Sequence, residues 1–216
     1  MASKPQPPPR RRRRTEETDV NTEIERLARE NERLRRQVRA LQHLREAVYR
    51  DSVTGLRNRR YFEERLDEEV RRLSRNPDRV GSLLLVDVDD FKQINDEHGH
   101  MVGDGVLREV ALIMGETLRL EDVCCRFGGD EFVVILPETG AEGAARVVAR
   151  LTEALDHRNR TAAFSLYLSV GHSTWPTDGI DAHALLSAAD RDMYASKRNG
   201  KRARTPVPPA PRLTLV

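Results

Sequence analysis

Acidic side chains cluster at the ends of two apolar runs, and they are the residues best suited to do chemistry. One cluster spans residues 87–90, and the other, Asp130-Glu131, directly follows Gly128-Gly129. A Gly-Gly pair between strand-like runs predicts a hairpin, because both glycines accept positive φ and let a ligand approach the backbone. If the two strands are neighbours, Asp87 and Asp130 converge at one edge of a sheet.

Carboxylates crowded at one edge repel one another unless a cation lies between them. Oxygen ligands of this kind suit Mg²⁺ (or Mn²⁺), which also binds waters and substrate phosphates. Carboxylates, a divalent metal and phosphate together are the apparatus for displacement at phosphorus. Isolated surface carboxylates are common at strand ends, but that interpretation fits this constellation poorly.

The segments that position these residues alternate between helix-like and strand-like patterns. We expect helices near 57–73, 91–97, 103–119, 140–156 and 181–198, and strands near 82–88, 123–127, 131–136 and 164–171. Strands that alternate with helices, together with one hairpin, predict an α+β domain over residues 51–204. Its mixed central sheet is expected to be covered by helices.

Residues 20–50 instead follow a seven-residue repeat. Its d positions are Val20, Leu27, Leu34, Leu41 and Val48, and its a positions are Ile24, Asn31, Val38 and Arg45. About four Leu-rich heptads are typical of a coiled coil, so we expect a dimerisation stalk here. Because a buried Asn pairs with its own copy across a parallel seam, Asn31 favours a parallel homodimer over a helix packed on its own domain.

The two ends of the chain differ from both of these parts. Prolines and the uninterrupted run Arg10–Arg14 predict a disordered arm over residues 1–19, and prolines also predict a flexible tail over residues 205–216. The arm is either a solubilising tail or a weak contact for an anionic partner such as nucleic acid, lipid or an acidic protein.

The formal net charge of +2 hides an asymmetry between the two halves of the chain. Residues 1–50 hold fourteen basic and eight acidic residues, a net +6, and the 23 basic and 27 acidic residues that remain give −4. No apolar run approaches the roughly 20 residues needed to cross a bilayer. We therefore predict a cytoplasmic protein without a membrane span.

Four motifs occur in order between about residues 48 and 204. They read Asp51-Ser-Val-Thr-Gly-Leu-Arg-Asn-Arg-Arg-Tyr-Phe62, Asp87-Val-Asp-Asp-Phe-Lys-Gln-Ile-Asn-Asp96, Gly99-His-Met-Val-Gly-Asp104 and Arg126-Phe-Gly-Gly-Asp-Glu-Phe132. In order and in spacing they resemble the GGDEF family of diguanylate cyclases, which condense two GTP molecules into cyclic di-GMP and release pyrophosphate. The resemblance implies the nucleotidyl-cyclase, ferredoxin-like fold of that family.

The resemblance also implies roles for the acidic residues. Asp87 and Asp130 would bind two metal ions with help from the Val88 carbonyl, and Glu131 would assist at the metal or accept a proton. The 3′-hydroxyl of one GTP would attack the α-phosphorus of another, twice. Since each domain binds one GTP, two domains must face each other, as a dimer held by residues 20–50 would allow.

Further residues are implied to bind substrate. Asn95 and Asp104 would hydrogen-bond the guanine edge, and an amide and a carboxylate match its mixed donors and acceptors better than those of adenine. The remaining substrate residues would be Lys92, Lys197 and Lys201, which hold the triphosphate, and the hairpin glycines Gly128 and Gly129. Lys201 stands where the family usually has Arg, so a bidentate phosphate clamp becomes a point charge.

A last resemblance concerns regulation. Arg119 and Asp122 match the RxxD site at which the family binds its own product, and Arg150 falls where the family places a further product-binding arginine. The simpler alternative is an Arg–Asp pair at the end of a helix. A catalytically silent receptor for GTP or cyclic di-GMP, which signals through its coiled coil, is the alternative to an active cyclase.

Overall fold

The computed structural model describes the backbone of residues 10–203 and the side chains of residues 23–42 and 45–198. Residues 1–9 and 204–216, which include the expected tail, lie outside the described residues, as do the side chains of Arg10–Arg14. The chain divides into two compact units, Met1–Val48 and Tyr49–Val216. The described part of the first unit is a single helix, and the second unit is an α+β domain.

The first helix, α1 (Arg10–Val48), is 39 residues long. It begins at Arg10, inside the segment 1–19 for which the sequence predicts a disordered arm. Arginine is a good helix former, and the prolines that would interrupt a helix all precede this point, so residues 10–19 continue the heptad helix. The seam residues Leu27, Leu34 and Leu41 are 54%, 48% and 66% exposed, so the apolar stripe of a single chain is uncovered.

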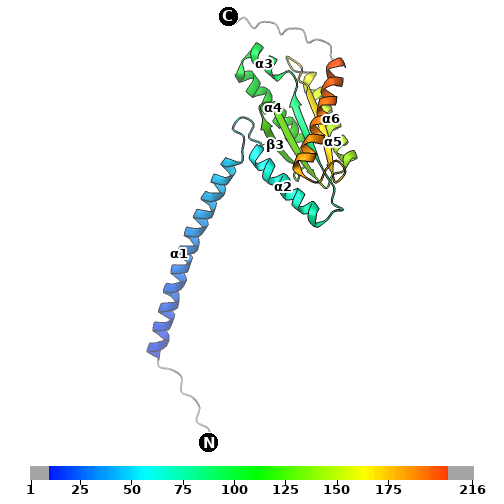
Figure 1. Ribbon diagram of the computed structural model, residues 1–216. Coiled ribbons are helices and arrows are strands. Elements are labelled where there is room, and N and C mark those ends of the chain that lie inside the picture. The colour runs from blue at the N-terminus through cyan, green and yellow to red at the C-terminus, as the bar shows by residue number, and fades with distance from the viewer. Residues whose placement is uncertain (1–9, 204–216) are drawn as a thin grey trace, which may run out of the picture. The chain divides into compact units, whose positions relative to one another are not determined.

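Five strands form the sheet of the second unit, in the order β1-β3-β4-β2-β5. Figure 1 shows these strands surrounded by helices of the same unit. Their bounds are β1 (Arg57–Asn58), β2 (Gly81–Val88), β3 (Val123–Gly128), β4 (Glu131–Pro137) and β5 (Leu168–Trp175). The pair β1–β3 is parallel and the other pairs are antiparallel. The expected mixed sheet is therefore confirmed, and β2 lies in its interior between β4 and β5.

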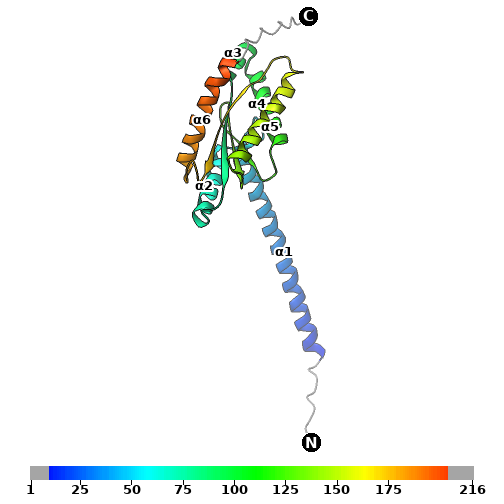
Figure 2. The ribbon, with the colours of Figure 1, turned by 90° about the vertical axis from the view of Figure 1, so that its right-hand side faces the viewer.

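Helices cover both faces of this sheet (Figure 2). α2 (Arg59–Arg75) and α6 (Ala182–Ala203) pack on one face, whereas α4 (His100–Thr117) and α5 (Ala141–Asn159) pack on the other. Alternation along β2 divides its side chains between two apolar cores: Leu83 and Leu85 face α2 and α6, and Leu84 and Val86 face α4 and α5. Because both faces are covered, β2 is buried along its whole length.

The last strand differs from its expected position. Residues 164–171 were expected to form it, but β5 spans Leu168–Trp175. The Asn159 side chain pairs with the backbone of Leu166 in the way a strand would, accepting from its N–H at 2.9 Å and donating to its carbonyl at 2.8 Å. A guanidinium N–H of Arg158 also donates to the Phe164 carbonyl. These side chains bind backbone groups that a strand would need for its ladder, so the segment before residue 168 forms a loop.

The helix expected at 103–119 also differs. α3 (Phe91–His98) and α4 are separated by Gly99 alone, whose φ of 85° breaks the helix, so α4 starts at His100 and ends at Thr117. Leu118 is extended, which leaves Arg119 to Asp122 as a turn. Among the described helices none is long and apolar enough to cross a membrane. The cytoplasmic location remains a prediction.

Candidate active site

The two acidic clusters meet at one end of the sheet. β2 and β4 are antiparallel neighbours, and their register places Asp87 opposite Glu131. The Val88 N–H donates to the Asp130 carbonyl at 3.1 Å, so the hairpin is fixed against the end of β2. The expectation that the two strands are neighbours is confirmed.

A lysine from the other end of the domain's sequence completes this cluster. Asp87 has the same parity along β2 as Leu83 and Leu85, so its side chain faces α6, and Lys197 of α6 reaches it. The Lys197 Nζ lies 2.6 Å from the Asp87 Oδ1. Burial alone would lower the pKa of Lys197, but the hydrogen bond to Asp87 and the nearby carboxylates outweigh it and raise that pKa.

The carboxylates themselves are held at a cost in electrostatic energy. Burial raises the pKa of Asp87, and the hydrogen bond and charge of Lys197 offset only part of that rise. Burial also raises the pKa of Glu131, and the charges of Asp87 and Asp130 raise it further. The cluster thus has an excess of negative charge that one lysine does not neutralise, which favours the binding of a cation.

The oxygen ligands at the strand edge supply part of the coordination shell of a divalent ion. Within the described residues, no three His, Cys, Asp or Glu side chains surround one point as a complete protein cage would. Mg²⁺ seldom uses such a cage, because it keeps waters and binds through one or two carboxylates plus substrate phosphates. Asp87 and Glu131, which face each other, together with the adjacent Asp130 and the Val88 carbonyl, are a donor set of that incomplete kind.

The hairpin that carries Asp130 is braced by an arginine that the sequence analysis did not assign. Gly129 has a φ of 38°, and its carbonyl accepts from Arg126 Nε at 3.0 Å and from Arg126 Nη2 at 2.7 Å. The Nη1 of the same guanidinium donates to both oxygens of Asp51, at 3.1 and 3.2 Å. Arg126 therefore joins the turn that begins the domain to the turn that carries the acidic residues.

The contacts of Asp51 stabilise its ionised carboxylate. Burial raises the pKa of Asp51, but hydrogen bonds from the Thr54 hydroxyl and N–H and from Arg126 outweigh burial, and the net pKa is lowered. The signal in the sequence was the presence of Asp51 and Arg126 in the first and last of the four motifs. Nothing in their spacing of 75 residues says that they touch.

The residues expected to bind guanine lie on the α3–α4 pair, which follows β2 directly. Asn95 belongs to α3, and Asp104 to the first turns of α4, and the two helices pack together. Lys92 is exposed on α3, close in sequence to the end of β2. Lys201 belongs to α6, but its side chain lies outside the described residues. Gly128 ends β3 and lies opposite Glu131.

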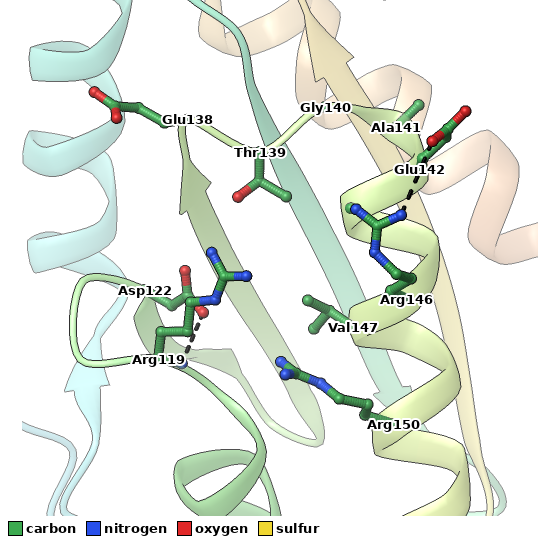
Figure 3. A pocket seen from close by; sticks show the side chains of 11 residues that line it. Arg119, Asp122, Glu138, Thr139, Gly140, Ala141, Glu142, Arg146, Val147 and Arg150 are labelled. Carbon is green, nitrogen blue, oxygen red and sulfur yellow. Dashed lines mark hydrogen bonds and ion pairs between the residues drawn. The ribbon is translucent and has the colours of Figure 1, made fainter.

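A second site is a cavity of about 580 Å³ on the other face of the sheet (Figure 3). It lies between the turn after α4, the end of β4 and the start of α5, and it contains all three residues expected at the product site, Arg119, Asp122 and Arg150. Arg119, Arg146 and Arg150 direct their guanidinium groups toward the same space, whereas Glu138 points away from it (Figure 3). Glu138 instead pairs with Arg79 at 3.2 Å.

The geometry of this pocket differs from a helix-end Arg–Asp pair. The Asp122 carboxylate accepts from the Arg119 backbone N–H at 2.8 Å, which leaves the Arg119 guanidinium free of that carboxylate. Burial raises the pKa of Asp122, and Arg119 offsets part of the rise. Arg150 donates to the Thr117 carbonyl at 2.8 Å. Sequence reasoning missed Arg146, although it precedes Arg150 by four residues on α5 and so shares its face.

Comparison with known proteins supplies the family. The profile of the family described as "Diguanylate cyclase, GGDEF domain" matches residues 48–203. The response regulator PleD of Caulobacter vibrioides is 40% identical over 168 residues, which is 76% of this chain and 37% of PleD. The chain thus spans little more than a third of that relative.

Solved structures agree. The coiled coil and GGDEF domain of DgcB from Caulobacter crescentus, in complex with c-di-GMP, has a TM-score of 0.70 and 28% identity, covering 82% of this chain and 95% of that one. The diguanylate cyclase SiaD from Pseudomonas aeruginosa, in complex with its activator SiaC, has a TM-score of 0.69 and 35% identity, covering 88% and 75%. The strand-edge carboxylates, their hairpin and these likenesses agree: this chain belongs to the GGDEF domain family of diguanylate cyclases.

Proposed function

We propose that this chain is an active diguanylate cyclase, which condenses two GTP molecules into cyclic di-GMP with release of two pyrophosphates. The observation that carries the proposal is the facing pair Asp87 and Glu131 at the ends of adjacent strands, with Lys197 held against it. A degenerate site would be expected to lack at least one of these groups, and the described site retains all of them.

The acidic residues would hold the metal and the lysines the phosphates. Asp87, Asp130 and the Val88 carbonyl would bind Mg²⁺ or Mn²⁺, and Glu131 would complete the binding of the metal or accept a proton. The bound ion would polarise the α-phosphate and neutralise charge that develops on it. Lys92, Lys197 and Lys201 would contact the triphosphate as point charges, and Gly128 and Gly129 would let it lie close to the hairpin backbone.

The reaction requires two such sites, and α1 offers a means to bring them together. Its exposed seam of Leu27, Leu34 and Leu41 is the surface that a second copy would cover in a coiled coil. A DgcB structure that resembles this chain includes a coiled coil as well as a GGDEF domain. A dimer through residues 20–50 would raise the effective concentration of each domain at the other to the millimolar range, on the order expected for short linkers.

Product inhibition is the second part of the proposal. Cyclic di-GMP carries two phosphates and two guanines, and the cavity of about 580 Å³ is lined by Arg119, Arg150 and the Asp122 carboxylate, with Arg146 held 3.9 Å from Glu142. Guanidinium groups bind phosphate in a bidentate way, and a carboxylate accepts from guanine. We therefore assign Arg119, Asp122 and Arg150 to product binding, with Arg146 beside them.

The test uses the purified full chain with GTP and Mg²⁺ over a range of protein concentrations. We expect cyclic di-GMP and pyrophosphate, measured by chromatography and by a coupled phosphate assay, with no dinucleotide from ATP. Binding of GTP or of cyclic di-GMP without any synthesis, at every protein concentration, would contradict the cyclase proposal and identify a silent receptor instead.

A further inference from the structure

Gly103 of α4 is a buried glycine, and a residue of α3 fills the space that a side chain at position 103 would take. A Cβ built on Gly103 would lie 2.0 Å from the Asn95 Oδ1 and 2.9 Å from the Asn95 Cγ. It would also lie 3.2 Å from the ring of Phe91. A Cβ atom essentially never lies within 3.0 Å of another heavy atom to which it is not bonded, so the Asn95 amide occupies the space that any other residue at position 103 would need.

This glycine is not required by the helix. Gly103 lies within α4, where glycine is less favourable than alanine by about 1 kcal/mol. Its backbone does not have positive φ, unlike that of Gly99 just before the helix. Gly105, two residues later in the same helix, has open space where its Cβ would be. A packing reason therefore exists at position 103 and not at position 105.

We propose that Gly103 is the positioning residue for guanine recognition: it lets the Asn95 amide lie against α4 at the residue before Asp104, so that one amide and one carboxylate face the same base. The inference rests on the proposed function, because it concerns how the GTP site selects its base. Within the described residues, neither the Asn95 nor the Asp104 side chain has a protein hydrogen-bond partner, which leaves both available to a ligand.

Substitution at this position should move the amide and spare the fold. The two nearest atoms belong to the end of the Asn95 side chain and none to the backbone, so we expect the amide to move and the backbone to stay in place. The displaced amide would leave its place against Gly103, and the base would lose a hydrogen bond to the protein. Because that bond forms equally in the bound ground state and in the transition state, the loss should raise KM and leave kcat nearly unchanged.

The experiment compares Gly103→Ala with Gly105→Ala in the full chain. Both variants replace glycine by alanine in α4, and both should keep or slightly raise Tm. We expect Gly103→Ala to raise the KM for GTP by about tenfold, and to raise by a similar factor the Kd of a non-hydrolysable GTP analogue measured by calorimetry with Mg²⁺; tenfold is the value of one hydrogen bond to a base. Gly105→Ala should change both by less than about twofold, since its Cβ meets nothing.

A double-mutant cycle shows whether the effect passes through Asn95. In the Asn95→Ala background, Gly103→Ala should cause no further loss of GTP affinity, because the displaced group is already absent. An undiminished loss in that background, or wild-type affinity in Gly103→Ala, would overturn the inference. GTP binding without synthesis by the unmodified chain would refute the cyclase proposal and leave this inference standing. A chain that binds no GTP at all would refute both.

Discussion

The domain has two polar regions that we propose bind related ligands, and they balance their charges differently. At the strand edge, carboxylates outnumber the single lysine whose side chain is described there, and burial with mutual repulsion raises the pKa of Asp87 and Glu131. The cavity beside α5 is lined by three arginines and three acidic residues, of which Glu138 pairs with Arg79 and Glu142 lies 3.9 Å from Arg146. A bound cation would offset the repulsion between the first site and a nucleotide phosphate, whereas the arginines of the second would bind a phosphate directly.

The two sites also differ in how they are built. The first lies at the end of β2, which is buried along its whole length, and its hairpin is braced by Arg126. The second lies between a turn and a helix, and the side chain of Arg146 is 74% exposed. A rigid site suits chemistry that needs fixed geometry, and an adaptable surface of long side chains suits the binding of a flexible product.

The largest effect is expected at the strand edge. Asp130→Ala should lower cyclic di-GMP synthesis by about a thousandfold or more, because several kcal/mol of metal-dependent stabilisation is lost. The variant should keep its circular dichroism spectrum and its affinity for cyclic di-GMP at the cavity, measured by calorimetry. Turnover within tenfold of the unmodified protein would refute the metal role of Asp130.

Substitution of Arg126, which holds the hairpin against Asp51, should give the next largest effect. Arg126→Lys cannot hold Asp51 and the Gly129 carbonyl at once, and we expect kcat to fall by about tenfold and the free energy of unfolding by about 2 kcal/mol. Since the pKa of Asp51 is lowered on folding, the contribution of Asp51 is fully present above about pH 4 and is lost as the pH falls below it. Denaturation at pH 7 measures the whole loss of stability, and denaturation at pH 3 measures the part that does not depend on an ionised Asp51.

The comparison for this prediction is Arg108→Lys, at an exposed position of α4. It should change neither the turnover nor the stability. Equal loss of stability at pH 7 and pH 3 in Arg126→Lys would show that the ion pair with Asp51 is not the part that matters.

Substitution of an arginine in the cavity should weaken inhibition by the product and leave catalysis unchanged. Arg119→Ala should raise the concentration of cyclic di-GMP that halves the activity by about tenfold or more, since a charged hydrogen bond to phosphate is lost, and the uninhibited kcat should stay the same. Inhibition curves at several product concentrations measure this, with Arg108→Ala as the control outside the cavity. An unchanged curve would mean that Arg119 does not bind the inhibiting product.

The smallest effect on activity is expected in the stalk. Asn31→Leu should strengthen helix association and relax its specificity, so that light scattering detects species larger than the dimer or an altered register. Activity should change only a few-fold, because the domains still meet. Arg36→Leu makes a similar apolar change off the seam, and a matching response in both variants would count against a buried Asn31.

Much of the fold followed from the sequence because its signals are local. The Gly-Gly hairpin, the apolar run that became β2 and the heptads of α1 each depend on neighbours a few residues away. The shift of the last strand from 164–171 to Leu168–Trp175 came from side chains of Asn159 and Arg158, which replace the ladder hydrogen bonds of the preceding segment. Hydrogen bonds between a side chain and the backbone of another segment have no periodicity in the sequence, so no sequence pattern could predict this shift.

By itself the sequence determined the chemical groups of this protein: the acidic pairs at two strand ends, the RxxD turn and the coiled-coil seam, since each is written in adjacent residues or in a fixed repeat. Only the tertiary structure decided which distant groups touch. Lys197 meets Asp87 across 110 residues, Arg126 meets Asp51 across 75, and Gly103 makes room for Asn95 between two packed helices. Contacts of that kind arise from strand order and helix packing, which depend on the whole chain rather than on any one segment.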